Sequence, residues 1–199
     1  LGLRLGSAAL AQEAERFGFG RGWTWLGPAL YRNPPKLETS EGNAPRQAIG
    51  YRMGATPLAM ARVYATVASG MIRPLRIVEQ EPPGPGQSLG LAPGDLARIR
   101  EGLRRVVGER GGTARRFGLD ELGAAGKTGT AQLSDGGEGE NNAWFAGFAP
   151  RSTPLLAFAI LAPGVPHGRH GGAVSAPVAR EFLADPVVRT WIEREGGGR

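Results

Sequence analysis

The spacing of apolar residues predicts helices in the first half of the chain. Apolar positions that recur every three or four residues mark the buried face of a helix. Leu10, Ala14 and Phe17 have this spacing after Ser7, a residue type that caps helix N-termini, and Gly18 is a typical stop signal. We therefore expect a first helix that begins at Ser7 and ends before Gly18.

Two further helices carry clear start signals. One begins after Thr56 with Pro57 at its first position and ends at Gly70. Another is opened by Pro93 and Asp95. The inward faces are expected to consist of Leu58, Ala61, Tyr64 and Val67 in the former helix, and of Leu96, Ile99, Leu103 and Val106 in the latter.

Between these two helices the sequence favours extended and irregular structure. Residues 73–78 are rich in strand-forming types, whereas 81–87 holds three prolines and two glycines and is predicted to be a surface loop.

The pattern changes to strand-like after the glycines at 111 and 112. Three strands are predicted at about 124–133, 143–149 and 155–161, joined by a polar loop at 134–142 and a tight turn at 150–154. Connections this short imply antiparallel neighbours. Helices at 176–183 and 186–193 are expected to follow, and the end of the chain has the composition of a frayed tail.

Composition bounds the class of protein. The chain has 199 residues, of which 41% are hydrophobic, enough for one globular domain or a large piece of one. The net charge of +6 comes almost wholly from scattered arginines, which does not predict a nucleic-acid partner. The absence of cysteine excludes disulfides and thiolate metal sites. The longest apolar run, around Leu155 to Val165, is shorter than the roughly 20 residues needed to span a bilayer.

The most informative motif is Lys127-Thr128-Gly129-Thr130. A strand lining an acyl-transfer site needs a fixed cation for an anionic substrate, hydroxyls for its carboxylate, and a glycine that lets the substrate backbone approach. It should also direct a main-chain N–H at the developing oxyanion. These four residues can supply all of this. A strand with its lysine and threonines on a solvated face is the alternative for the tetrapeptide taken alone.

The order of the motifs resembles the transpeptidase domain of penicillin-binding proteins, over nearly the whole chain. Phe-Gly-Phe-Gly stands at 17–20, Gln-Ala-Ile-Gly at 47–50, and Thr-Pro-Leu-Ala-Met-Ala-Arg-Val-Tyr-Ala from 56. Gly-Thr-Ala follows at 112–114, then the Lys-Thr-Gly-Thr strand, then Ala-Trp-Phe-Ala-Gly-Phe-Ala-Pro from 143. The Thr-Pro-Leu helix and the Ala-Trp-Phe strand make the likeness closest to the high-molecular-weight class B members.

The resemblance implies an α+β fold, a five-stranded antiparallel sheet flanked by helices, of which this chain is expected to hold three strands. We interpret 1–194 as the C-terminal portion of such a domain and 195–199 as a flexible tail. The family's serine and general base lie in Ser-x-x-Lys, and a proton relay lies in Ser-x-Asn; neither motif occurs in these residues. The chain is expected to begin just past the latter, and any targeting segment or membrane anchor of the parent is expected upstream.

The family also implies residue roles. Lys127 would set the electrostatics of the nucleophile and hold the substrate; Thr128 and Thr130 would bind the terminal carboxylate of the acyl donor or of a β-lactam. Gly129 separates these hydroxyls, and the Thr130 N–H would contribute to the oxyanion hole. The parent would be a periplasmic, membrane-anchored D,D-transpeptidase that cross-links peptidoglycan stem peptides through a serine acyl-enzyme, without a cofactor and without a nucleic-acid partner.

On this interpretation the chain alone is inactive and needs the remainder of its own domain. The alternative is a non-catalytic ligand-binding or pseudo-enzyme module that keeps the transpeptidase-like fold.

Other candidate sites are weaker. His167 and His170 form a His-x-x-His without an evident third metal ligand. The acidic stretch fits no calcium-binding loop and favours a solvated hairpin tip. The arginines between 98 and 116 favour a solvated helix face over phosphate contacts, and the two tryptophans near 24 favour packing over base stacking. The acidic stretch consists of Asp135, Glu138, Glu140 and Asn141, and the two tryptophans are Trp23 and Trp25.

Overall fold

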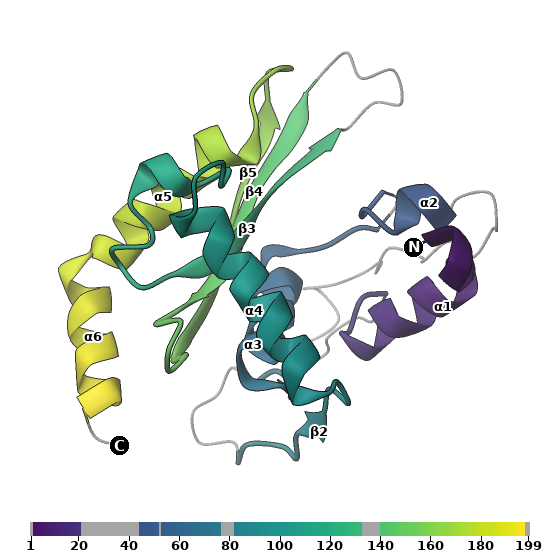
Figure 1. The fold of residues 1–199 in the computed structure, drawn as a ribbon, viewed down its shortest axis with the longest axis horizontal. Helices are drawn as coiled ribbons and strands as arrows, with labels where there is room; N and C mark the ends of the chain where they lie inside the picture. The colour runs from purple at the N-terminus through teal and green to yellow at the C-terminus, as the bar shows by residue number, and fades with distance from the viewer. Residues whose placement is uncertain (1, 21–43, 52, 77–81, 133–139, 198–199) are drawn as a thin grey trace. The chain divides into compact units, whose positions relative to one another are not determined.

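The computed structural model describes residues 2–20, 44–51, 53–76, 82–132 and 140–197. They belong to two compact units, Leu1–Ala59 and Met60–Arg199, which are treated separately below. Figure 1 labels the helices and all strands except β1. No helix among the described residues is both long and apolar enough to cross a membrane.

The first unit holds helices α1 (Gly2–Arg16) and α2 (Ala44–Gln47). The range of α1 begins at Gly2, but it joins two helical segments across a break at Gly6, and the second segment begins at Ser7 as predicted. The backbone leaves the helical region at Gly6 (φ 77°, ψ 160°), a conformation that glycine adopts without a steric penalty. Ser7 thus follows a break within α1. The helices meet closely: a Cβ on Gly2 would lie 2.5 Å from the carbonyl oxygen of Ala44.

Helix α3 (Pro57–Ser69) begins as predicted. The Thr56 hydroxyl accepts a hydrogen bond from the Ala59 N–H at 3.1 Å, which satisfies one of the free donors at the helix start. Leu58, expected on the inward face, is 43% exposed. The buried residues of the helix are Ala59, Thr66 and Ala68, so the covered face is narrower than the apolar stripe in the sequence.

A two-stranded ribbon that the sequence did not indicate follows α3. Strand β1 (Met71–Ile72) pairs antiparallel with β2 (Gln87–Ser88). The expectation of a strand at 73–78 is wrong for its described residues, 73–76, which are irregular. Pro74 explains this, since it has no N–H to donate to a strand ladder. The predicted loop is confirmed from 82 to 86, and its last residue, Gln87, belongs to β2.

Helix α4 (Pro93–Gly108) starts at the predicted proline, with Asp95 in its first turn. The buried part of α4 lies in its second half, where Val107 is fully buried. Ile99, which was expected on the inward face, is 42% exposed. Near the middle of α4, Arg100 donates to the carbonyl oxygens of Val67 and Ala68 at 2.9 and 2.8 Å. These bonds satisfy two acceptors left free at the C-terminal end of α3.

The main sheet confirms the three predicted antiparallel strands, in the order β3 (Ala125–Gln132), β4 (Asn141–Ala149), β5 (Leu156–Val165). Strand β4 begins two residues earlier than predicted, and β5 ends four residues later. Residue pairing places Thr128 opposite Phe145, and Phe145 opposite Ile160. Since side chains alternate between the faces of a sheet, these three residues lie on one face.

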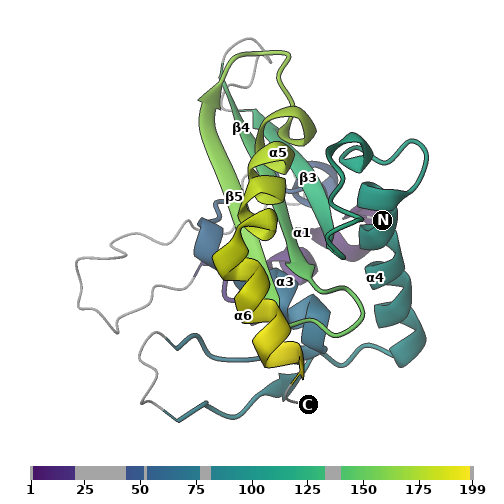
Figure 2. The ribbon, with the colours of Figure 1, turned by 90° about the vertical axis from the view of Figure 1, so that its left-hand side faces the viewer.

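Helices α5 (Gly171–Ala184) and α6 (Pro186–Gly197) complete the fold. Figure 2 shows α5 lying across the sheet, with α6 continuing from it. The start predicted at 176 is wrong by five residues, because Gly171 and Gly172 form the first turn of α5. Helix α6 extends four residues past its predicted end, and the flexibility expected of the tail stays a prediction.

Each face of the sheet contributes to a separate cluster of buried side chains. On the α5 face, the aromatic rings of Phe145 and Phe158 stack with centroids 6.0 Å apart and pack with residues of α5. On the opposite face, Phe148 packs with Ala125 and with Ala68 of α3. The sheet is thereby held from both sides, which fixes the position of β3.

Candidate active-site strand

The Lys-Thr-Gly-Thr motif lies within β3, which forms an edge of the described three-stranded sheet. Pairing places Lys127 opposite Ala146 and Gly129 opposite Trp144, on the face that carries Phe148. Thr128 and Thr130 lie on the α5 face. The strand therefore presents its cation on one face and its two hydroxyls on the other, at an edge of the described sheet.

Thr128 is paired with a residue from the segment after α4. Its Oγ1 lies 2.7 Å from Oγ1 of Thr113, and either hydroxyl can be the donor. Two hydroxyls hold two hydrogens, and this bond uses one. The second hydrogen remains for an acceptor outside the pair, and the pair is fixed in place by its own bond.

Thr130 is tied to the start of α5. Its Oγ1 accepts a hydrogen bond from the Gly171 N–H at 3.1 Å. A threonine hydroxyl used in this way as an acceptor keeps its own hydrogen for donation. The bond orients Thr130 and at the same time satisfies one of the free N–H groups at the N-terminus of α5.

The close approach of α5 to the sheet depends on two glycines. A Cβ on Gly171 would overlap the carbonyl oxygens of Gly129 and Trp144. A Cβ on Gly172 would lie 2.5 Å from the Thr113 carbonyl oxygen and 3.3 Å from the Thr128 methyl group. Any larger residue at these positions would separate the helix from β3.

Gly129 itself lies against Trp144 of the neighbouring strand. A Cβ at Gly129 would lie 3.3 Å from the Trp144 Cβ, a tight but not impossible contact. The absence of a side chain here leaves the surface between Lys127 and Ala131 low, which lets another chain approach the strand closely.

Lys127 is exposed, and its Nζ donates to the carbonyl oxygen of Thr128 at 2.9 Å. Within the described part of the chain no carboxylate forms an ion pair with it. Its positive charge is therefore available to an anionic ligand.

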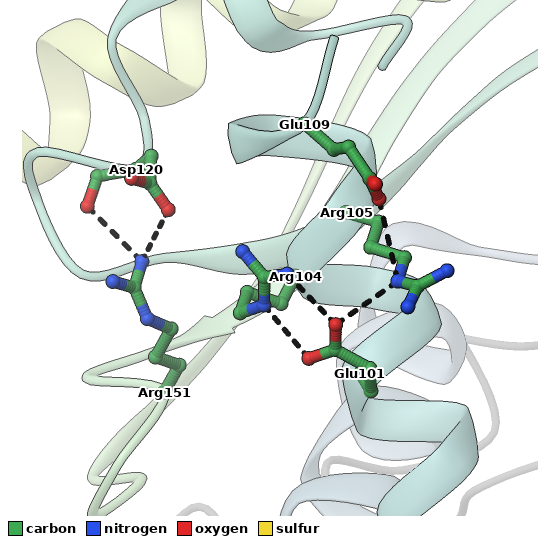
Figure 3. Close-up of polar contacts among 6 residues, drawn as sticks. All are labelled: Glu101, Arg104, Arg105, Glu109, Asp120 and Arg151. Atoms are coloured by element: carbon green, nitrogen blue, oxygen red, sulfur yellow. Dashed lines mark hydrogen bonds and ion pairs between the residues drawn. The ribbon is translucent and has the colours of Figure 1, made fainter. Parts of the chain in front are cut away.

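The arginines of α4 have a structural explanation. Figure 3 shows Glu101 between Arg104 and Arg105, with Glu109 contacting Arg105 from the next turn. Hydrogen bonds from Arg104, and then from Arg105, lower the pKa of Glu101 to about 2. These pairs support the predicted solvated face.

A second ion pair shown in Figure 3 joins the loop before β3 to the turn after β4. Arg151 Nη1 lies 2.6 Å from Oδ1 of Asp120 and also donates to the Asp120 carbonyl oxygen at 3.1 Å. The contact ties together two connections at the same end of the sheet.

The metal candidates find no support among the residues that the structure describes, where no three of His, Cys, Asp or Glu gather closely enough to hold an ion. His170 is the N-cap residue of α5 but makes no capping hydrogen bond through its side chain. The tryptophans at 23 and 25, and the acidic residues at 135 and 138, lie outside the described residues.

Sequence reasoning singled out the four residues of the motif but not the residues that position them. Thr113 enters the sequence analysis only within the Gly-Thr-Ala of the resemblance, and Gly171 and Gly172 have no predicted role there. The doubled glycine directly before a run of small and apolar residues was the signal for a close helix contact.

Comparison with known proteins shows which family the chain belongs to. Residues 1–184 match the family described as "Penicillin binding protein transpeptidase domain". The chain is 36% identical over 198 residues to peptidoglycan D,D-transpeptidase FtsI of Escherichia coli K12, covering 96% of this chain and 33% of that protein. It is 29% identical to peptidoglycan D,D-transpeptidase PbpA of Mycobacterium tuberculosis H37Rv, covering 92% of this chain and 40% of that protein.

The fold is similar to that of Pseudomonas aeruginosa PBP2, solved in complex with WCK 5153. The TM-score is 0.69 at 28% identity, covering 94% of this chain and 44% of that one. The chain thus spans between a third and a half of the length of these relatives. The match over residues 1–184 and the shared fold mean that this chain belongs to the penicillin-binding protein transpeptidase family.

Proposed function

We propose that this chain is the C-terminal portion of a bacterial peptidoglycan D,D-transpeptidase and that β3 forms the wall of its acyl-donor site. The observation that carries the proposal is the arrangement around β3: an exposed Lys127 on an edge strand, with two threonine hydroxyls held in place by partners of their own.

The edge of β3 suits a peptide that binds as an added strand. Main-chain groups on the outer side of an edge strand can pair with an extended ligand, and alternate side chains then add specificity. A stem peptide or a β-lactam placed there would have its carboxylate next to the hydrogens that Thr128 and Thr130 can still donate. Lys127 would add a charge-assisted contact. The Thr130 N–H would stabilise the oxyanion of the tetrahedral intermediate.

The chemistry would be completed by residues outside this chain. A serine and its lysine base, in a Ser-x-x-Lys motif of the longer protein, would form the acyl-enzyme. The serine attacks the donor carbonyl, the terminal residue leaves with the proton, and an acceptor amine then takes the acyl group. We infer a periplasmic location for this protein and a membrane anchor outside the present chain.

Labelling with a fluorescent penicillin tests the proposal. The longer protein should be acylated, whereas the 199 residues alone should not. Labelling of the 199-residue piece would contradict the assignment of the nucleophile. A longer protein without Ser-x-x-Lys would favour the alternative of a non-catalytic module with the same fold.

A pair of substitutions can distinguish a specific role of Lys127 in acylation from a general effect of losing one positive charge. Lys127→Met in the longer protein should slow acylation by about ten-fold or more, as expected for loss of a charge-assisted contact to the substrate. Arg98→Met provides the control, because it also removes one positive charge from a side chain that is 84% exposed and lies on α4. Equal acylation rates for the two variants would refute the role of Lys127.

A further inference from the structure

The five residues between β5 and α5 lie next to the candidate substrate strand. Residues 166–170, of sequence Pro-His-Gly-Arg-His, are all exposed. The Arg169 N–H donates to the Pro166 carbonyl oxygen at 3.1 Å, which closes a turn. His170 then leads into α5 with an extended backbone (φ −111°, ψ 154°).

The distance from this segment to β3 is set by Gly171. The N–H of Gly171 donates to Thr130, and Gly171 packs directly on the carbonyl oxygens of Gly129 and Trp144. Consecutive Cα atoms are 3.8 Å apart, so the Cα of Arg169 lies within about 7.6 Å of the Cα of Gly171. Arg169 is therefore two residues along the backbone from the N–H that is hydrogen-bonded to Thr130.

Among the residues that the structure describes, no carboxylate pairs with the basic side chains of this segment. Within the described residues, neither Arg169 nor His170 makes a side-chain hydrogen bond or ion pair. Arginines elsewhere in the same unit do, as Arg104, Arg151 and Arg189 illustrate. The carboxylate of Glu140 lies beside Gly164, near the end of β5.

We propose that Arg169, assisted by His170, forms a cationic subsite that binds a carboxylate on the side chain of the acyl donor. The inference rests on the proposed function and extends it to substrate specificity. The terminal carboxylate of the donor is assigned to Thr128 and Thr130, so the group bound by Arg169 is a second one. The planar guanidinium fork matches a carboxylate with two parallel hydrogen bonds, and His170 supplies a further ring N–H.

The preferred substrate class is thus an acyl donor that carries an anionic group beside its reacting end. Two penicillins that differ by one such group provide the probe. Carbenicillin is benzylpenicillin with an additional carboxylate on its side chain. The ratio of their second-order acylation rates on the longer protein reports recognition of that carboxylate, because every other part of the two molecules is shared.

Arg169→Gln should lower the carbenicillin-to-benzylpenicillin ratio by about two- to five-fold, the range expected for one exposed ion pair. Arg169→Lys should retain most of the ratio. In wild type, raising the salt to about 1 M should reduce the preference, because the Debye length falls to about 3 Å. Arg189→Gln is the matched control and should leave the ratio unchanged, since Arg189 lies beyond the far end of α5, about 20 Å away at 1.5 Å per helical residue.

An unchanged ratio in Arg169→Gln overturns the subsite while leaving the proposed function intact. If Arg169→Gln slows acylation by carbenicillin and by benzylpenicillin equally, the subsite is also overturned. The ratio of the two rates is then unaltered, and the substitution has only a structural effect. Failure of the wild-type protein to react with either penicillin overturns the proposed function, and the subsite with it.

Discussion

The contact between α5 and β3 allows a stringent prediction at Gly171. In Gly171→Ala the new methyl group would overlap the carbonyl oxygens of Gly129 and Trp144 and would lie 2.9 Å from the Trp144 N. All three atoms belong to the backbones of two paired strands, β3 and β4, which cannot move aside as a flexible side chain can. The helix must therefore retreat from the sheet.

The loss in free energy of unfolding caused by Gly171→Ala has two contributions. Overpacking of a well-packed site typically costs about 1–3 kcal/mol. Loss of the Gly171 to Thr130 hydrogen bond adds about 0.5–1.5 kcal/mol. The sum centres on about 3 kcal/mol. At about 2–4 °C per kcal/mol for a cooperative unit of 150–250 residues, the melting temperature should fall by roughly 6–12 °C.

Acylation should suffer as well, because Thr130 loses the partner that orients it. A displacement of about 1 Å in a positioning group can cost roughly 100-fold in rate. The assay is the rate of fluorescent penicillin labelling in the longer protein, measured well below the melting temperature of the variant.

Gly102→Ala is the control for this substitution. Gly102 lies inside α4 with nothing within 4 Å of its added Cβ. Alanine there should stabilise the protein by about 0.5–1 kcal/mol and leave acylation unchanged. If Gly171→Ala behaved like Gly102→Ala in both assays, the close packing of α5 on β3 would not be what positions Thr130.

Three further predictions concern stability. Phe145→Ala, at a fully buried position under α5, should destabilise the protein by about 3–5 kcal/mol in chemical denaturation; a loss below 1 kcal/mol would contradict its place in the core. The pKa of Glu101 is held at about 2 by Arg104, below its ordinary 4.5, so the stability contributed by the carboxylate is present above pH 4.5 and is lost as the pH falls toward 2. Melting temperatures measured across that range should therefore depend less on pH in Glu101→Gln than in wild type, and parallel curves would refute this. Arg100→Met removes two hydrogen bonds to the end of α3 and should speed amide exchange at Gly70, the residue after that helix, while leaving exchange in β4 unchanged.

The elements with strong local patterns were predictable. Alternation of side chains and short polar connections identified the three antiparallel strands, and Pro93 with Asp95 marked the start of α4, because these signals depend only on neighbours in the sequence. Which residues of a helix are covered depends on other elements. Ile99 has the right spacing to be buried but lies in the more exposed half of α4 and is itself 42% exposed, while Val107 is fully buried.

The sequence by itself determined the chemistry of the candidate site: the motif Lys127 to Thr130, the expected roles of its cation and hydroxyls, and the family whose motif order it shares. Only the tertiary structure decided what holds that motif in place. Thr113 reaches Thr128 across 15 positions of the chain, and Gly171 reaches Thr130 across 41. Such contacts leave no local pattern, because they arise when separate elements pack. Nothing in the local sequence requires glycine at 171 and 172. Glycine is required there because the backbone of neighbouring segments leaves no room for a Cβ.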